Sequence, residues 1–279
     1  MQYTPWVPQS EPLAACIDTM FVLENYRPEH ARERIVPDAT VTLVMELDGR
    51  PRHVYEPGTD RIRQTFRGAW LSGVHRHFIT IGDTNFDSTL MATRFKLGGA
   101  RPLLPADLED LNDRVVPAEE LFGDAIHRLR DEILAQEDSA ARLARMACFW
   151  EGRHDPEQQP PEAAATAVAT LVESPAEVSI ADLAHHAAVS PKHLLTLFRR
   201  HVGPTPKQLQ RILRFYRVFE RLQAGQVQDW AELSLELGYA DQSHFIREFT
   251  RFSGYRPAEF ARRDSDRPNF FPEDDGDGR

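Results

Sequence analysis

A repeat in the C-terminal half constrains this chain more than any other feature of its sequence. Residues of the same type recur 51 positions apart, namely His193 with His244, Phe198 with Phe249, Gly203 with Gly254 and Pro206 with Pro257. Upstream the spacing is 50 positions, as between Leu183 and Leu233, and the one extra residue falls where a turn is expected. A repeat whose insertion lies in a turn predicts two copies of a helix-turn-helix unit.

In each copy the second helix is expected to bury one face and to expose a polar one. The apolar residues that share a face are Phe245, Phe249 and Phe252 in the later helix, and Leu194, Leu197 and Phe198 in the earlier one. The second helix of such a unit enters the major groove of DNA. The residues predicted to read bases are Lys192, Leu195, Thr196 and Arg199 in the first copy, and Gln242, Ser243 and Arg247 in the second.

One long helix, from about residue 206 to residue 224, is predicted to join the two copies, and Gly225 ends it. Its expected buried face carries Leu209, Ile212, Leu213, Tyr216 and Phe219. The predicted contacts to DNA phosphates are Arg214, Arg217 and, from the second reading helix, Arg251. An ordinary solvated face is the alternative for the arginines of the long helix. The joined reading helices are expected in successive major grooves, about 34 Å apart.

These motifs resemble the DNA-binding domain of AraC/XylS-type transcriptional regulators. The resemblance covers roughly residues 163–263 and is carried by "PKQLQRILRFYRVFERLQAG" and "ELGYADQSHFIREFTRFSGYRPAEF". It implies a sequence-specific DNA-binding transcription regulator whose partners are double-stranded DNA and, for an activator, RNA polymerase. It also implies a separate N-terminal domain that senses a small-molecule effector or forms a homodimer. The pattern "RERIVPDATVTLVMEL" followed by "RFKLGGARPLL" is similar to the N-terminal domains of one bacterial subgroup.

One position departs from the family pattern. Members usually carry an arginine two positions before the aromatic anchor of the first reading helix, and here Thr196 stands two positions before Phe198. The second unit keeps its arginine, Arg247 before Phe249. Threonine can contact a thymine methyl group, but it cannot make the bidentate contact of arginine with guanine. Whether the first unit reads bases is therefore open.

Charge and composition agree with a partner that is anionic. The net charge of the chain is -10, but residues 190–263 contain 13 basic and 7 acidic residues. No apolar run reaches the ~20 residues of a membrane span, and no secretory signal is visible at the N-terminus. With only two cysteines, Cys16 and Cys148, a disulfide framework is not expected. The expected location is the cytoplasm, and no membrane contact is expected.

The first hundred residues predict a cupin-like β-barrel or sandwich. Residues 40–47 are a β-branched run, and the Asp48-Gly49 pair that follows predicts a hairpin. From Pro117 the pattern is helical and forms an appendage that ends near Trp150. This appendage is the expected contact of a homodimer, although it could equally pack on its own barrel. The predicted fold class is α+β. Its parts are a regulatory domain (1–150), a linker (151–162), a DNA-binding domain (163–263) and a disordered acidic tail (264–279).

The alternative function is an enzyme, or a metal- or small-molecule-binding cupin-like domain, fused to a DNA-binding module. No catalytic residues and no cofactor are expected, because the sequence has no nucleophile-elbow pattern and no cysteine cluster with zinc spacing. His75 and His77 could share a strand face, but no third metal ligand is evident, so no metal is expected. Four aromatic residues either line a pocket or, the favoured reading, fill the core: Phe21, Trp70, Phe78 and Phe95. The sequence does not identify effector-binding residues.

Overall fold

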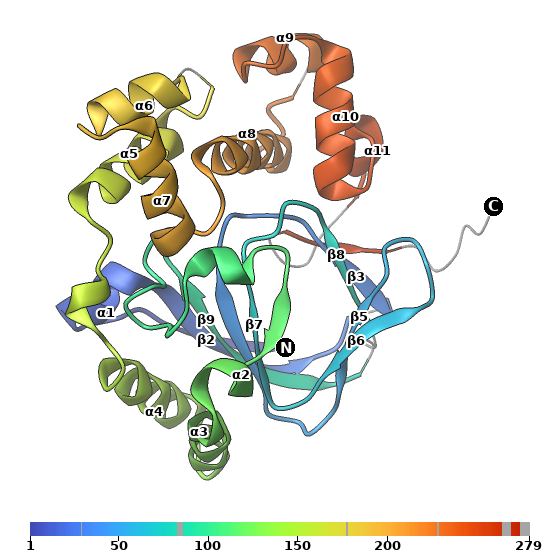
Figure 1. The fold of residues 1–279 in the computed structure, drawn as a ribbon. Helices are drawn as coiled ribbons and strands as arrows, with labels where there is room; N and C mark the ends of the chain where they lie inside the picture. Colours follow the sequence, from blue (N-terminus) through green and yellow to red (C-terminus); the bar gives the residue numbers. More distant parts are fainter. Residues whose placement is uncertain (29, 83–85, 177, 228, 264–268, 274–279) are drawn as a thin grey trace.

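The computed structural model describes every residue except 29, 83–85, 177, 228, 264–268 and 274–279. A domain built on two β-sheets lies beneath a domain of helices, and further short helices flank the sheets on the side away from the helical domain (Figure 1). This arrangement confirms the predicted fold class. Among the described residues, no helix is both long enough and apolar enough to cross a membrane.

The N-terminal domain contains two antiparallel sheets, one of six strands and one of five. The first sheet has the order β1 (Gln2–Trp6), β2 (Ile17–Tyr26), β9 (Ser88–Phe95), β4 (Thr42–Glu46), β7 (Ala69–Ser72) and β10 (Val115–Pro117). The second has the order β11 (Phe270–Pro272), β3 (Arg32–Ile35), β8 (Ile79–Gly82), β5 (Arg52–Tyr55) and β6 (Ile62–Phe66).

The hairpin predicted at Asp48-Gly49 is wrong. A turn does form there, and Gly49 has the positive φ of 76° that glycine adopts readily. However, β4 pairs with β7 and β9, whereas β5 pairs with β6 and β8, so the turn leads from one sheet to the other. The Asp48 carboxylate accepts hydrogen bonds from Arg52 at 2.5 Å and from the backbone N–H of Thr89 at 3.0 Å. Turn residues specify a local backbone shape, whereas the sheet that the next strand joins depends on its pairing with β6 and β8.

Helices cover the outer face of the first sheet, which is the alternative to a dimer contact that the sequence left open for the appendage. They are α2 (Glu119–Phe122), α3 (Asp124–Leu134) and α4 (Ser139–Glu151), and α1 (Glu11–Cys16) lies between β1 and β2 in sequence. Trp150 at the end of α4 is fully buried, and its indole Nε1–H donates to Thr93 Oγ1 at 3.0 Å. Its ring also lies edge-on to Phe95, with centroids 5.2 Å apart. Alternate residues of β9 therefore face the helices, and those between them face the interior of the domain.

The C-terminal domain has the predicted pair of helix-turn-helix units. Its helices are α5 (Glu162–Glu173), α6 (Ile180–His186), α7 (Pro191–His201), α8 (Pro206–Gln223), α9 (Trp230–Glu236), α10 (Gln242–Ser253) and α11 (Pro257–Phe260). Helices α6 and α7 form the first unit, α9 and α10 form the second, and α8 joins them (Figure 1). The structure also has two short 3-10 helices: η1 (Leu108–Leu111) lies between β9 and β10 in sequence and contacts α7, and η2 (Pro156–Gln158) lies in the connection from α4 to α5.

The buried face of α8 differs in part from the predicted one. Leu209, Ile212 and Phe219 are buried as predicted, whereas Leu213 and Tyr216 are only partly buried. The helix buries Phe215 and Val218 in addition, because it contacts both units and not a single layer. A helix held between two neighbours buries a wider stripe than one amphipathic face.

The C-terminal tail returns to the N-terminal domain. Phe270–Pro272 form β11, which pairs with β3 in antiparallel register. The disorder predicted for residues 264–279 is therefore wrong for this strand, while residues 264–268 and 274–279 lie outside the described residues. Phe271 is 1% exposed. The burial of Phe271 and the partial burial of Phe270 supply apolar contact that the acidic residues of the tail lack.

Candidate nucleic-acid interface and ligand cavity

Helix α10 is held in place by an aromatic seam. It begins after Asp241, whose carboxylate accepts from the backbone N–H of His244 at 2.7 Å, an ordinary N-cap. Phe245, Phe249 and Phe252 are all buried, as the spacing predicted. The rings of Phe249 and Phe252 lie 5.2 and 5.0 Å from that of Phe215 on α8. The seam fixes which face of α10 meets solvent.

The residues predicted to read bases from α10 lie on its exposed face. Gln242, Ser243 and Arg247 are exposed, and the first two stand in the first turn. Among the described residues, Arg247 has no ion-pair or hydrogen-bond partner for its guanidinium. The recognition helix of a helix-turn-helix unit contacts bases mainly through its N-terminal part. This surface has the position and the donor groups that such contacts need.

Helix α7 also has one buried apolar face and one exposed face, but its exposed face carries fewer hydrogen-bond donors than that of α10. Its buried residues are Leu194, Leu197 and Phe198. Of the predicted reading residues, Lys192 and Thr196 are exposed and Leu195 is half-buried. The Thr196 hydroxyl donates to the carbonyl of Lys192 at 3.2 Å, so its hydrogen is used within the helix. The Thr196 methyl group and the Lys192 ammonium therefore remain for contact on this face of the helix.

The last turns of both reading helices contact the N-terminal domain, and their first turns point away from it (Figure 1). Arg199 of α7, predicted to read bases, lies 3.5 Å from the Glu109 carboxylate of η1. Arg251 of α10, predicted to contact phosphate, donates through Nε to His77 Nε2 at 2.8 Å. Burial and the neighbouring Arg251 guanidinium lower the pKa of His77, which keeps the imidazole neutral and able to accept this bond.

The phosphate contact predicted for Arg214 does not fit its position. Its side chain is 8% exposed, lies 3.5 Å from the Glu248 carboxylate, and donates to the carbonyl of Gly238 at 2.9 Å. Glu248 is itself buried and also accepts from Arg211 at 2.8 Å. Arg217 remains reachable from solvent, although it pairs with Glu220 at 3.0 Å. Spacing along α8 could not separate these arginines, because they share one side of the helix.

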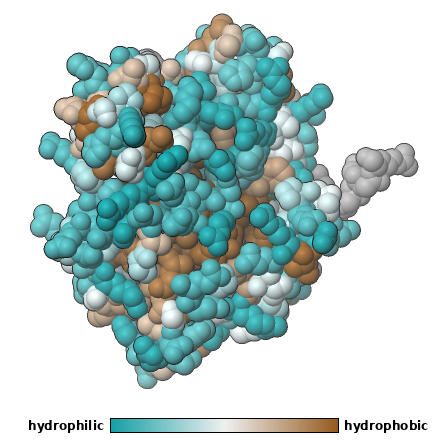
Figure 2. Space-filling model, viewed as in Figure 1, coloured by the Kyte–Doolittle hydropathy of each residue, from teal (hydrophilic) through white to brown (hydrophobic). Residues whose placement is uncertain are grey.

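A cavity of about 180 Å³ lies between the two sheets of the N-terminal domain. Apolar side chains from both sheets form most of its wall, including Val44, Val54, Phe66, Trp70, Ile81 and Leu90. The space-filling view shows apolar residues in the N-terminal domain below the helical domain, with a largely hydrophilic surface around them (Figure 2). No motif in the sequence pointed to this cavity. The alternation in β9, where Leu90, Ala92 and Arg94 face inward, is the signal that could have found it.

Of the four aromatic residues that the sequence left open between pocket and core, two line the cavity and one lies in the core. Phe21 and Trp70 line the cavity. Phe95 is fully buried against Trp150, and Phe78 lies under the Arg34 guanidinium, 4.7 Å from it. The core interpretation is therefore right for Phe95 and wrong for Phe21 and Trp70.

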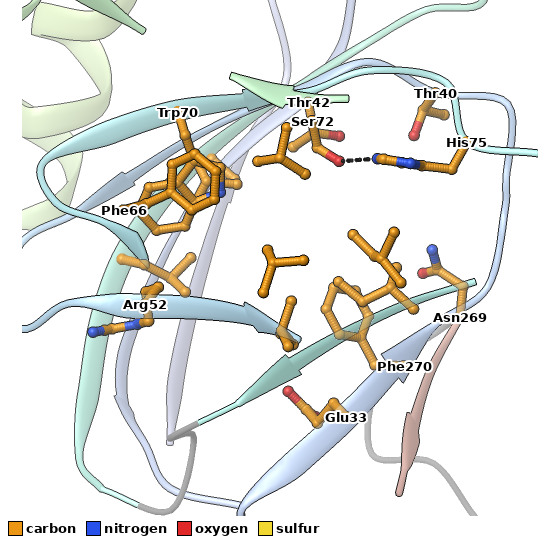
Figure 3. Close-up of a pocket in the computed structure, with 18 of the residues that line it drawn as sticks. Glu33, Thr40, Thr42, Arg52, Phe66, Trp70, Ser72, His75, Asn269 and Phe270 are labelled. Carbon is orange, nitrogen blue, oxygen red and sulfur yellow. Dashed lines mark hydrogen bonds between the residues drawn. The ribbon is translucent and has the colours of Figure 1, made fainter. Parts of the chain in front are cut away.

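Polar groups gather at one end of the cavity, where Thr40, Thr42, Ser72 and His75 lie together (Figure 3). His75 Nε2 is 3.0 Å from the Ser72 hydroxyl. Burial lowers the pKa of His75 to about 4, so the ring is neutral at pH 7. His77 turns to Arg251 instead, so the two histidines considered for a shared metal bind different partners.

Comparison with known proteins agrees with this division of the chain. A helix-turn-helix domain family (HTH_18) matches residues 183–263, and a domain of unknown function (DUF6597) matches residues 6–117. The raffinose operon transcriptional regulatory protein RafR of Pediococcus pentosaceus is 33% identical over 84 residues. That match spans 29% of this chain and 29% of the relative.

Solved structures are similar at low sequence identity. Apo ToxT K231A from Vibrio cholerae has a TM-score of 0.46 at 12% identity, over 87% of this chain and 96% of that one. A transcriptional regulator with an AraC-type DNA-binding domain from Chromobacterium violaceum has a TM-score of 0.34 at 24% identity, over 38% of this chain and 92% of that one. The helix-turn-helix match covers the two units described above. The resemblance to AraC/XylS-type regulators is thus confirmed for the C-terminal domain, whose residues 183–263 match a helix-turn-helix domain family.

Proposed function

We propose that this protein is a sequence-specific transcription regulator that reads two successive major grooves and whose N-terminal domain controls its binding to DNA. The observation that carries the proposal is the exposed first turn of each reading helix, beside a buried seam that fixes its orientation. In the second unit Arg247 is a cation without a partner among the described residues, and an arginine so placed suits a bidentate contact with guanine. Because such a protein must reach DNA, its proposed location is the cytoplasm.

The two units have different parts in this proposal. The second supplies Arg247, Gln242 and Ser243 to base edges. The first supplies Lys192 and the apolar surface of Thr196 and Leu195, which suits a thymine methyl group or a phosphate better than a guanine. The expected result is a strong preference at one half of the site and a weak one at the other.

Control by the N-terminal domain is proposed from the contacts at the last turns of the reading helices. Arg199 and Arg251 are basic residues on the DNA-binding domain, and both are bonded to the N-terminal domain. A change in the N-terminal domain that breaks these contacts frees two cations in the last turns of the reading helices. An effector in the cavity is the proposed cause of that change. We further propose that α3 and α4 form the contact of a homodimer. If the protein is an activator, it also contacts RNA polymerase.

Selection of duplexes from a random library by the full-length chain tests the proposal. The expected product is a site with two preferred patches whose centres are about 10 base pairs apart, one helical turn. The logarithm of affinity should fall linearly with the logarithm of salt concentration, with a slope near -0.9 for each phosphate contacted. The proposal is falsified if no sequence is enriched, or if binding is independent of salt.

A further inference from the structure

We propose that the cavity binds an uncharged, largely apolar molecule of about two rings, and that β11 transmits its presence to the second helix-turn-helix unit. This inference rests on the proposed function, since it names the effector class and the route of control. Two sets of contacts carry it, one at the wall of the cavity and one at the strand.

The charged side chains at the cavity wall are already paired. Arg94 lies 3.0 Å from Asp38, and Arg52 lies 2.5 Å from Asp48, so neither guanidinium is left to bind a carboxylate ligand. Glu33 accepts a hydrogen bond from the Tyr26 hydroxyl at 3.0 Å. A charged ligand would have to lose its hydration and break one of these pairs, which is costly in a buried site. An uncharged ligand avoids both costs.

The size and the walls of the cavity suit a flat molecule. An engineered apolar cavity of about 150 Å³ holds one benzene ring, so about 180 Å³ suits a slightly larger ring system. Phe66 and Trp70 lie on one side of the cavity, with ring centroids 5.7 Å apart, and Phe270 lies on the other (Figure 3). The Ser72 and His75 pair at the polar end can exchange a hydrogen bond with one hydroxyl or N–H group of the ligand.

Consecutive residues of β11 contact the cavity and the DNA-binding domain. Phe270 lines the cavity. Phe271 points to the other side of the strand, where its ring lies 4.4 Å from that of Phe260 and 5.8 Å from that of Phe219. Phe260 in turn packs edge-on against Phe249 of the seam of α10, at 5.3 Å. A ligand against Phe270 is thus separated from the reading helix by a short chain of packed rings.

Hydrogen bonds fix both ends of β11. At its start, the backbone N–H of Val36 donates to the carbonyl of Asn269 at 2.9 Å, and the Asn269 amide donates to Asp38 at 3.2 Å. At its end, the carbonyl of Pro272 accepts from the Tyr255 hydroxyl at 3.1 Å. Because β11 is bonded to both domains, it cannot shift without changing the contacts of each. This is the kind of shared element through which two sites influence each other.

The ligand class is tested with 2-naphthol and 2-naphthoate, which share a ring system and differ in charge at pH 7. Calorimetry with the full-length chain should show binding of 2-naphthol and at least 10-fold weaker binding of 2-naphthoate. Leu90→Phe fills part of the cavity and should weaken the binding of 2-naphthol at least 10-fold. Equal binding of the two probes, no binding of 2-naphthol, or no effect of Leu90→Phe overturns the assignment of the ligand.

The route is tested by measuring affinity for a selected duplex with and without saturating 2-naphthol. The wild-type affinity should change at least 5-fold, a usual size for coupling between sites. Phe271→Ala should still bind probe and duplex, but it should lose most of the ratio between DNA affinities with and without 2-naphthol. Tyr255→Phe removes one bond to β11 and perturbs folding less, and it should reduce the same ratio. Phe122→Ala, a matched loss of a ring in α2, should keep it.

The outcomes separate this inference from the proposed function. If the chain enriches no duplex, the proposed function fails before coupling is measured. If it binds a duplex and 2-naphthol but the probe leaves DNA affinity unchanged, the proposed function stands and the inference is overturned. If the ratio persists in both Phe271→Ala and Tyr255→Phe, control does not pass through β11 and the inference is again overturned.

Discussion

The guanidinium of Arg214 and the carboxylate of Glu248 form an ion pair at 3.5 Å, with side chains 8% and 4% exposed. The pair joins α8 to α10, and the further bond from Arg214 to the carbonyl of Gly238 reaches the turn between α9 and α10. Loss of the Arg214 side chain would remove both of these bonds from a buried site, while Glu248 would keep its ion pair with Arg211 at 2.8 Å. These two residues therefore act on the stability of the second unit and only indirectly on its contact with DNA.

Arg214→Ala is expected to lower the free energy of unfolding by about 2–3 kcal/mol, because it loses the buried ion pair with Glu248 and the bond to Gly238. Arg217→Ala is the matched control, because Arg217 stands one turn along the same helix and its partner Glu220 is exposed. An exposed pair contributes about 1 kcal/mol or less, so this variant should be close to wild type. Urea unfolding followed by circular dichroism measures both. Equal effects of the two substitutions would contradict the structural role of Arg214.

How far the sequence predicts this structure depends on the range of the interactions involved. The repeat, the phenylalanine seam of α10 and the exposure of Arg247 follow from spacing along a helix, and the structure has all of them. The burial of Arg214 does not follow from spacing, because it depends on Glu248 from another helix. A buried glutamate on a reading helix gives no signal until its partner is placed beside it.

The pairing between strands that are distant in sequence could not be predicted either. Asp48-Gly49 indicates a turn but not the sheet that the chain enters next. The acidic tail reads as disordered from composition, although the adjacent Phe270 and Phe271 were a signal that part of it is buried. The cavity is formed by both sheets together, so the alternation in β9 indicates one part of its wall and not the rest.

His77→Ala is expected to strengthen binding to a selected duplex, because it releases Arg251 from the N-terminal domain. The effect should be several-fold, in the range usual for coupling between sites. The salt dependence should steepen by roughly one unit of slope if the freed guanidinium reaches a phosphate. Fluorescence anisotropy at several salt concentrations measures both quantities. His127→Ala, an exposed histidine of α3, is the control, and the same gain in that variant would show that Arg251 is not the cause.

The pH dependence of stability should carry a contribution from His75. Its pKa is about 4 in the folded protein, mainly because of burial, against 6.5 for an ordinary histidine. Between these values the unfolded chain binds a proton that the folded protein does not, so stability falls as pH falls from 6.5 toward 4. The expected loss is about 2 kcal/mol between pH 7 and pH 5. Unfolding in urea at both pH values should show a smaller loss for His75→Asn, and identical losses would refute the assignment.

Arg247→Ala gives the most direct test of the reading face of α10. Arg247 is exposed and central on that face, and the Phe245, Phe249 and Phe252 seam on the opposite side fixes its direction. If it makes a bidentate contact with guanine, its loss should cost about 1–3 kcal/mol on the selected duplex and relax preference at one base pair. Arg217→Ala, if Arg217 contacts a phosphate, should weaken all sequences alike. Repeating the selection with both variants separates the two effects, and an unchanged base preference in Arg247→Ala would mean that another face of this helix meets the DNA.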